Sequence, residues 1–429
     1  MTKPIYNQAG ENIRIIFHNG VVISMEDGQP RAEAIAIAKD TILAVGSDDE
    51  ILALAEKNTD VIDLGGRTLM PGFIDSHSHW IGDREIGGYK TPDEAIEVTL
   101  RRGWTSIDEI DENQALLDEL IALDEEERLR VRVNAYLPVN RTFEKFGNWY
   151  LNHKPGFEYS PLLRIAGIKL FLDQDWGAVL YWTQEELNAY VLEAHQNGWQ
   201  VASHTISIEA HDMLFNAFEN ALGKGESGMP YRHRVEHVVQ IRDDQLERMR
   251  HFGAIASVQP TGPGDWLSEE DFVNLTADDL SWLMRWRDLM AGGVHMIGST
   301  DGPWLPPCAK DPSANVEISF SPLGVIYQAV TGNGYSGRTL GDWHLKQTLT
   351  VEQALRLLTI NGAYGTFQEN MKGSLAPGKY ADLVILSDNP LTVSVEKLLE
   401  IDVLMTMVGG RVEYCAEGIE ALLGDLPKA

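Results

Sequence analysis

The sequence has little cysteine, few basic residues and no long apolar run. It contains two cysteines, Cys308 and Cys415, in 429 residues. Two are too few for a disulfide framework, and their separation gives no Cys-x-x-Cys metal pair. No apolar run approaches the ~20 residues that a membrane helix needs, and the first residues lack the apolar segment of a secretion signal. We therefore expect a cytoplasmic protein without a membrane partner.

Acidic residues outnumber basic residues almost two to one. Lys and Arg total 35 against 64 Asp and Glu, which gives a net charge of −29. Nucleic-acid binding requires a basic surface, so we expect no nucleic-acid partner. The charge favours a divalent metal and a neutral or cationic small-molecule substrate. Most of the acidic residues are expected to be solvated surface, and a homodimer is compatible with the sequence.

Both ends of the chain have the pattern of short strands. Apolar residues alternate on both sides of Asn19-Gly20, which predicts a β-hairpin. Glu33–Ala38 and Thr41–Val45 predict a second pair of strands, and Val403–Val408 precedes a Gly-Gly turn and another strand. Two β-rich ends around a different middle predict one small discontinuous β-sandwich domain, made of residues 1–70 and 370–429.

The middle of the chain alternates strands with amphipathic helices. Thr91 precedes a proline and a glutamate in the pattern of a capped helix start, and Thr183 and Thr350 begin two capping boxes. Eight such units favour an α/β fold, a parallel (β/α)8 TIM barrel over residues 71–369, with a doubly wound sheet as the alternative. The expected strands are Phe73–Ser76, Thr105–Glu109, Val131–Leu137, Arg164–Leu172, Val201–Thr205, Arg234–Val238, Ala254–Gln259 and Val294–Ser299.

Residues with metal-binding side chains lie at the ends of these strands. His77 and His79 follow an apolar strand two positions apart, so both imidazoles lie on one face. Each residue alone has a structural interpretation, as a buried histidine, a turn cap or a salt bridge. In a barrel, however, the carboxyl ends of the strands converge on one site. The set therefore predicts a functional site at the barrel mouth, with His77 and His79 as candidate metal ligands and Lys169, His204, His237 and Asp301 converging on the same point.

This set of motifs resembles the amidohydrolase superfamily of metal-dependent hydrolases. It is most similar to the amidohydrolase 3 branch, which includes N-substituted formamide deformylase-like proteins. The resemblance covers nearly the whole chain, and the motifs occur in the family order. It rests on Pro71–His79, Gly167–Asp173, His204, Arg234–His237, Ala256–Pro260, Asp301–Pro303 and Lys372–Val384.

The resemblance implies a role for each ligand. His77 and His79 would hold one metal, His204 and His237 a second, and an N6-carboxylated Lys169 would bridge the two. Asp301 would bind metal and act as general base and acid, while the metal lowers the pKa of water so that hydroxide forms. We expect one or two divalent ions, zinc first, although iron, nickel or manganese also suit mixed nitrogen and oxygen ligands.

The expected reaction is hydrolysis of a non-peptide C–N bond in an amide, N-acyl or N-formyl compound. An esterase, lactonase or phosphoester hydrolase on the same ligands is the alternative, and a non-catalytic scaffold is the third. The acidic and aromatic segment after the lysine strand, and the short segment Trp80–Gly103, depart from the relatives and suggest a different substrate. The expected substrate-binding residues are Trp80, Asp173, Asp175, Trp176, Gln259 and Trp304.

Overall fold

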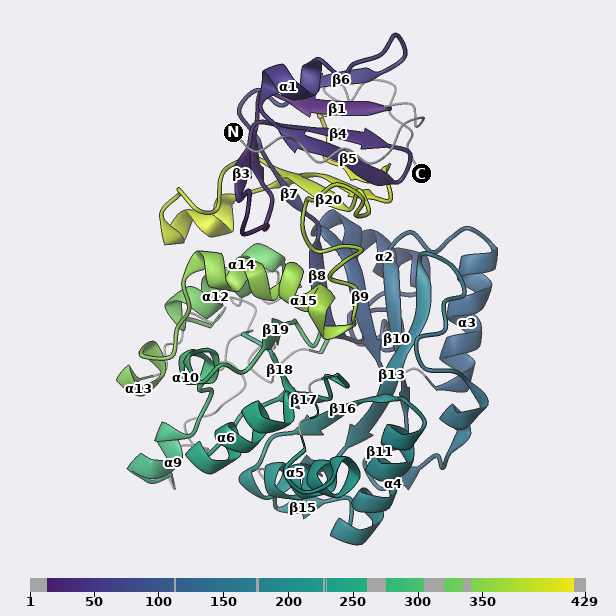
Figure 1. Ribbon diagram of the computed structural model, residues 1–429, viewed down its shortest axis with the longest axis vertical. Helices are drawn as coiled ribbons and strands as arrows, with labels where there is room; N and C mark the ends of the chain where they lie inside the picture. Colours follow the sequence, from purple (N-terminus) through teal and green to yellow (C-terminus); the bar gives the residue numbers. More distant parts are fainter. Residues whose placement is uncertain are drawn as a thin grey trace.

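Eight parallel strands form the centre of the molecule (Figure 1). The computed structural model describes residues 14–111, 113–174, 177–226, 228, 230–260, 275–304, 320–334 and 341–419. The strand order is β19-β18-β17-β16-β13-β10-β9-β8, so each strand lies beside its neighbour in the chain. Their bounds are β8 Phe73–Ser78, β9 Trp104–Ile110, β10 Arg132–Pro138, β13 Leu163–Phe171, β16 Gln200–Thr205, β17 Arg234–His237, β18 Ile255–Val258 and β19 Met296–Gly298. The predicted (β/α)8 barrel is confirmed.

The barrel is nearly closed between its two edge strands, β19 and β8. The chain that follows β19 hydrogen-bonds to the end of β8: the Asp301 amide donates to the His77 carbonyl at 2.9 Å, and the His79 amide donates to the Gly302 carbonyl at 2.6 Å. The Asp75 carboxylate accepts hydrogen bonds from the amide and hydroxyl of Thr300 at 2.8 and 2.6 Å. These bonds bring the carboxyl ends of the first and last strands together.

Helices surround the strands, and their predicted starts are present (Figure 1). Thr91, Thr183 and Thr350 each cap a helix through a side-chain oxygen that accepts a backbone N–H. No helix in the described ranges is long and apolar enough to cross a membrane. The helices around the barrel are α2 Pro92–Arg101, α3 Gln114–Glu125, α4 Gln184–Gln196, α5 Ile208–Leu222, α6 Asp243–Phe252, α9 Ala277–Ser281, α10 Trp286–Ala291, α12 Pro322–Thr331, α13 Asp342–Leu345, α14 Val351–Leu357 and α15 Ile360–Gly365.

Two further sheets lie beside the amino end of β8 and contain strands from both ends of the chain (Figure 1). Ile15, Phe17 and Ile35 of one sheet share an apolar core with Leu69 and Leu383 of the other, so the predicted discontinuous sandwich is confirmed. One sheet has the order β5-β4-β1-β6, with β1 Ile15–His18, β4 Ala34–Ala38, β5 Thr41–Gly46 and β6 Asp60–Asp63. The other has the order β22-β21-β20-β7-β2-β3, with β2 Val21–Ile23, β3 Arg31–Ala32, β7 Thr68–Pro71, β20 Leu383–Leu386, β21 Val403–Val408 and β22 Arg411–Cys415.

The hairpin predicted at Asn19-Gly20 is wrong, although the pairs β4–β5 and β21–β22 are present. Strand β1 pairs with β4 and β6, whereas β2 pairs with β3 and β7 in the other sheet. Asn19 has a left-handed backbone (φ 54°), and its side chain donates to Asp63 at 2.7 Å. The turn therefore connects the two sheets. β1 and β2 each pair with strands farther along the chain instead of with each other.

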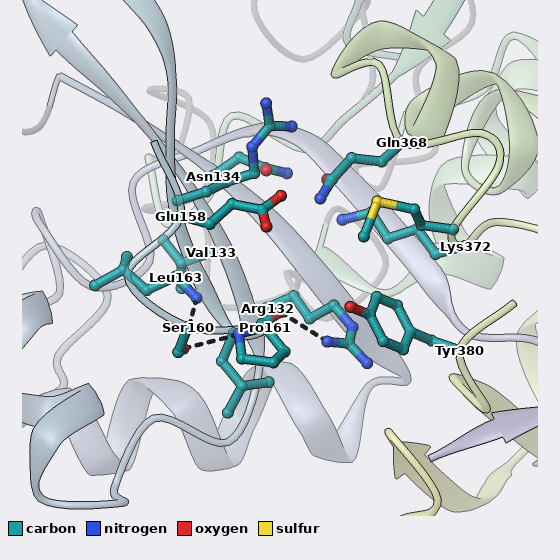
Figure 2. Close-up of a pocket in the computed structure, with 13 residues that line it drawn as sticks. Arg132, Val133, Asn134, Glu158, Ser160, Pro161, Leu163, Gln368, Lys372 and Tyr380 are labelled. Carbon is teal, nitrogen blue, oxygen red and sulfur yellow. Dashed lines mark hydrogen bonds between the residues drawn. The ribbon is translucent and has the colours of Figure 1, made fainter. Parts of the chain in front are cut away.

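The barrel and the six-stranded sheet are joined through a buried ion pair. Arg132 of β10 donates to both carboxylate oxygens of Asp382, at 2.6 and 2.8 Å. Its guanidinium lies 3.8 Å from the centre of the Tyr380 ring. Figure 2 shows this junction, where Lys372 and Gln368 lie across a small polar pocket from Asn134. This end of the barrel therefore has a structural role in holding the two parts together.

Candidate metal centre

A cavity of about 710 Å³ lies at the carboxyl ends of the barrel strands. Ligand pockets in proteins commonly measure ~300–1,000 Å³, so this cavity has the size for a small molecule. The structure brings the predicted ligands together around it. The lining includes His77, His79, Lys169, His204, His237 and Asp301.

The tightest cluster consists of His77, His79 and Asp301. Oxygen Oδ1 of Asp301 lies 3.3 Å from Nε2 of His77 and 3.4 Å from Nε2 of His79. The ligand atoms of the three residues all lie within 4.8 Å of one another. Asp301 adopts the left-handed backbone region (φ 57°), which directs its carboxylate back towards β8. Two imidazole nitrogens and a carboxylate oxygen form a donor set that fits a divalent transition metal.

The protonation states of the cluster suit metal binding. Burial, together with the charge of Lys169, lowers the pKa of His77 to about 3, so its ring is neutral at physiological pH. Although burial opposes the effect, Asp301 raises the pKa of His79. Burial also disfavours the Asp301 carboxylate, but the surrounding histidines hold its pKa below the usual range. The cluster therefore offers the Asp301 carboxylate and the neutral imidazole of His77, while a metal at His79 would compete with a proton for that ring.

His237 and His204 extend the group beyond His77. The ring centre of His237 is 4.9 Å from that of His77 and 4.4 Å from that of His204. Burial lowers the pKa of both rings, so both are neutral donors. The His204 ring stacks on Phe171 at 3.9 Å. The five ligand-type residues therefore form a continuous group across the mouth of the barrel.

Lys169 lies on β13, below the histidines, and is 1% exposed. Burial lowers the pKa of its amine. A neutral amine is the form that reacts with carbon dioxide to give a carbamate, which supplies oxygen ligands that a protonated lysine lacks. The position of Lys169 thus fits either a buried amine or a carboxylated bridge.

The residues predicted to bind substrate lie in different environments. Trp304 lines the cavity and is 43% exposed. Gln259 is in contact with His237, whose Nδ1 lies 2.8 Å from its Oε1. Trp80 is buried with its Nε1 donating to Asp75, and Asp173 accepts hydrogen bonds from the amides of Ile206 and Ser207, the two residues before α5. Neither side chain lines this cavity. Asp175 and Trp176 lie outside the described residues.

Several cavity residues were not predicted from the sequence. Asp111 directly follows β9, and Arg141 follows β10 and donates to Asp111 at 2.9 Å. Both have the signal that identified the ligands, a polar residue just after a barrel strand. The two-stranded ribbons β11 Asn140–Arg141 with β12 Glu144–Lys145, and β14 Asp173–Gln174 with β15 Val179–Leu180, supply much of the remainder. The additional lining residues are Asp83, Asp111, Arg141, Thr142, Glu144, Phe171 and Gln174.

Known proteins share both the sequence pattern and the fold. The chain is 27% identical over 320 residues to the protein LONG AFTER FAR-RED 3 of Arabidopsis thaliana, which covers 69% of this chain and 50% of that protein. It is 24% identical over 271 residues to N-substituted formamide deformylase of Arthrobacter pascens, which covers 59% of this chain and 46% of that enzyme. The chain therefore spans about half the length of these two curated relatives.

The fold also has a solved counterpart. The crystal structure of an uncharacterized metal-dependent hydrolase from Pyrococcus horikoshii superimposes with a TM-score of 0.73 at 21% identity, covering 89% of this chain and 99% of that one. A model of the Amidohydrolase family matches residues 90–414, well over half of the chain. With that match, and with strand ends that bring four histidines, a lysine and an aspartate to one cavity, the chain belongs to the amidohydrolase family.

Proposed function

We propose that this protein is a metal-dependent hydrolase that cleaves a C–N bond, other than a peptide bond, in a small amide, N-acyl or N-formyl compound. One observation carries the proposal. The carboxylate of Asp301 lies within 3.4 Å of the Nε2 atoms of both His77 and His79, at the floor of a cavity of about 710 Å³. The family membership and the similarity to a formamide deformylase support the choice of bond.

Each residue of the site has its own proposed role in the reaction. His77, His79, His204 and His237 would hold the metal, with zinc the first candidate for a site rich in histidine. When bound, the cation lowers the pKa of a water and polarises the carbonyl of the substrate. Asp301 is ionised at neutral pH, so its carboxylate can accept the proton of the attacking water and return it to the leaving nitrogen. The residues that line the cavity above them would orient the substrate.

The number of metal ions in the site, one or two, depends on the chemical state of Lys169. We propose that it is carboxylated and bridges a pair, supported by its burial and its position below the histidines. Lys169→Ala should then lower the metal content from two ions towards one and reduce turnover. A Lys169→Ala variant with full metal content and full activity would contradict the bridged pair.

The test is a hydrolysis screen of the metal-loaded protein. N-acyl, N-formyl, cyclic amide, ester and lactone substrates are compared, and metal content is measured on the same samples. We expect an amide class to be preferred, and Asp301→Asn to lower kcat by about 10²–10⁴-fold. Asp212→Asn, which removes a carboxylate beside Arg242 far from the cavity, serves as the matched control. Preferred hydrolysis of esters or lactones, or a protein that neither binds metal nor hydrolyses any substrate, would overturn the proposal.

A further inference from the structure

The interior of the barrel contains charged residues directly below the metal centre. Arg234 and Glu236 lie two positions apart on β17, so both point to the same face, and both are fully buried. The interior of a TIM barrel is ordinarily filled with branched apolar side chains. Burial of an arginine costs free energy unless its donors are all matched. The contacts of Arg234 therefore indicate what this residue contributes.

Arg234 hydrogen-bonds to five strands of the barrel. It donates to both oxygens of Glu236 at 2.7 and 3.1 Å, and to Asp108 of β9 at 2.8 Å. It also donates to the hydroxyl of Tyr136 on β10 at 2.8 Å, and to Ser257 of β18 at 3.4 Å. Its last contact is with the backbone carbonyl of Ser76 on β8. One guanidinium thus connects β8, β9, β10, β17 and β18.

Two of these contacts lead to the same ligand, His77. Ser76 immediately precedes His77 in the chain, so Arg234 holds the backbone at the base of that side chain. Glu236 contacts the imidazole at the other end of the His77 side chain, where its Oε2 lies 2.6 Å from Nδ1. A carboxylate on Nδ1 fixes the proton there and leaves the lone pair of Nε2 free, and Nε2 is the atom that faces Asp301.

We propose that Arg234 is a positioning residue of the metal centre. It fixes Glu236 in the barrel interior, and Glu236 fixes the tautomer and the orientation of the His77 imidazole. Arg234 is not among the residues that line the cavity, and it acts only through Glu236 and the Ser76 backbone. The inference rests on the proposed function, because it concerns the affinity of that site for its ion.

The chain offers a matched control for this arginine. Arg132 is also buried and also binds a carboxylate with two hydrogen bonds, but its partner is Asp382 at the junction with the six-stranded sheet. Arg132 is not among the residues that line the metal-centre cavity. Arg132→Met and Arg234→Met therefore impose the same substitution, and only the second lies next to His77.

The experiment measures the zinc affinity of the metal-stripped protein by competition with a chromophoric chelator, with the folded fraction checked by circular dichroism. We expect Arg234→Met and Glu236→Gln each to weaken zinc binding by about 10–100-fold. The double variant should bind zinc at most about threefold more weakly than the weaker-binding single variant, because both residues act on one ligand. Arg132→Met should lower the melting temperature but leave zinc affinity within about threefold of wild type.

Each outcome bears on the proposal. Folded Arg234→Met that binds zinc as tightly as wild type would overturn it, and so would fully additive losses in the double variant. If Arg234→Met does not fold, Glu236→Gln decides alone, because this isosteric change preserves the volume of the interior. Wild-type protein that binds no stoichiometric zinc, iron, nickel or manganese would instead defeat the proposed function, so the two failures are distinguishable.

Discussion

At the scale of single residues, Asp75 shows how the first and last strands of the barrel are held together. Its carboxylate accepts hydrogen bonds from the amide and hydroxyl of Thr300 and from Nε1 of Trp80 at 2.9 Å. Thr300 directly precedes Asp301, so the position of the proposed general base depends on this contact. Because β8 and β19 share no ladder of their own in the described sheet, this side chain acts with the backbone hydrogen bonds of Asp301 and His79 to support the seam where His77, His79 and Asp301 meet.

Substitution of Asp75 should therefore disturb both stability and the site. In Asp75→Asn an amide nitrogen replaces an oxygen that accepts two hydrogen bonds, which leaves buried donors unmatched. We expect a loss of about 2–4 kcal/mol in the free energy of unfolding, measured by urea denaturation, and a parallel loss of turnover. Thr300→Ser keeps the hydroxyl and should stay within about 1 kcal/mol of wild type. Wild-type stability in Asp75→Asn would show that the seam does not depend on this carboxylate.

At the scale of strands and helices, the barrel could be predicted because its signals are local. Most barrel strands are short apolar runs followed by a helix start, such as Thr183 before α4, and this alternation allows few topologies. The hairpin at Asn19-Gly20 failed because a turn signal reports only that the chain changes direction. Whether β1 then pairs with β2 depends on β4, β6 and β7, which are distant in the sequence.

The candidate site could be predicted only in part for a related reason. Parallel strands bring their carboxyl ends to one edge, so strand-end residues such as His204 and His237 could be grouped without knowledge of their contacts. Glu236 lies within the segment Arg234–His237 that supported the resemblance, yet its partner His77 is 159 positions away and meets it only inside the folded barrel. The orientation of Trp80 towards Asp75 likewise depends on packing that no local pattern encodes.

The junction between the barrel and the six-stranded sheet gives a prediction at the same scale. Asp382→Ala leaves the buried guanidinium of Arg132 without its carboxylate, so we expect a loss of about 3–5 kcal/mol in the free energy of unfolding. The double variant Arg132→Met with Asp382→Leu removes both charges and should be more stable than Asp382→Ala. Guanidinium denaturation of the three proteins measures both differences. A double variant less stable than Asp382→Ala would indicate that the ion pair gives the junction net stability, beyond avoiding an unpaired buried charge.

At the scale of the whole molecule, buried or partly buried histidines outside the cavity link stability to pH. Burial lowers the pKa of His211, His295 and His344 to about 4 and that of His233 to about 3. In the unfolded chain each would have a pKa near its usual ~6.5. Below that value the unfolded state binds protons that the folded state does not, so stability is lost as pH falls from ~6.5 towards ~4. Asp75 acts in the opposite direction, because burial raises its pKa to about 7.

We therefore expect the free energy of unfolding to fall by about 3–6 kcal/mol between pH 7 and pH 5, with the four histidines outweighing Asp75. Urea denaturation at closely spaced pH values measures the slope. His344 tests the assignment: both its ring nitrogens lack a hydrogen-bond partner among the described residues, and its ring packs edge-on against Trp286 at 5.0 Å. His344→Phe should keep this packing. It should also reduce the dependence of the free energy of unfolding on pH by about one bound proton. An unchanged slope in His344→Phe would mean that this ring is protonated in the folded protein, and that its burial does not contribute to the acid sensitivity.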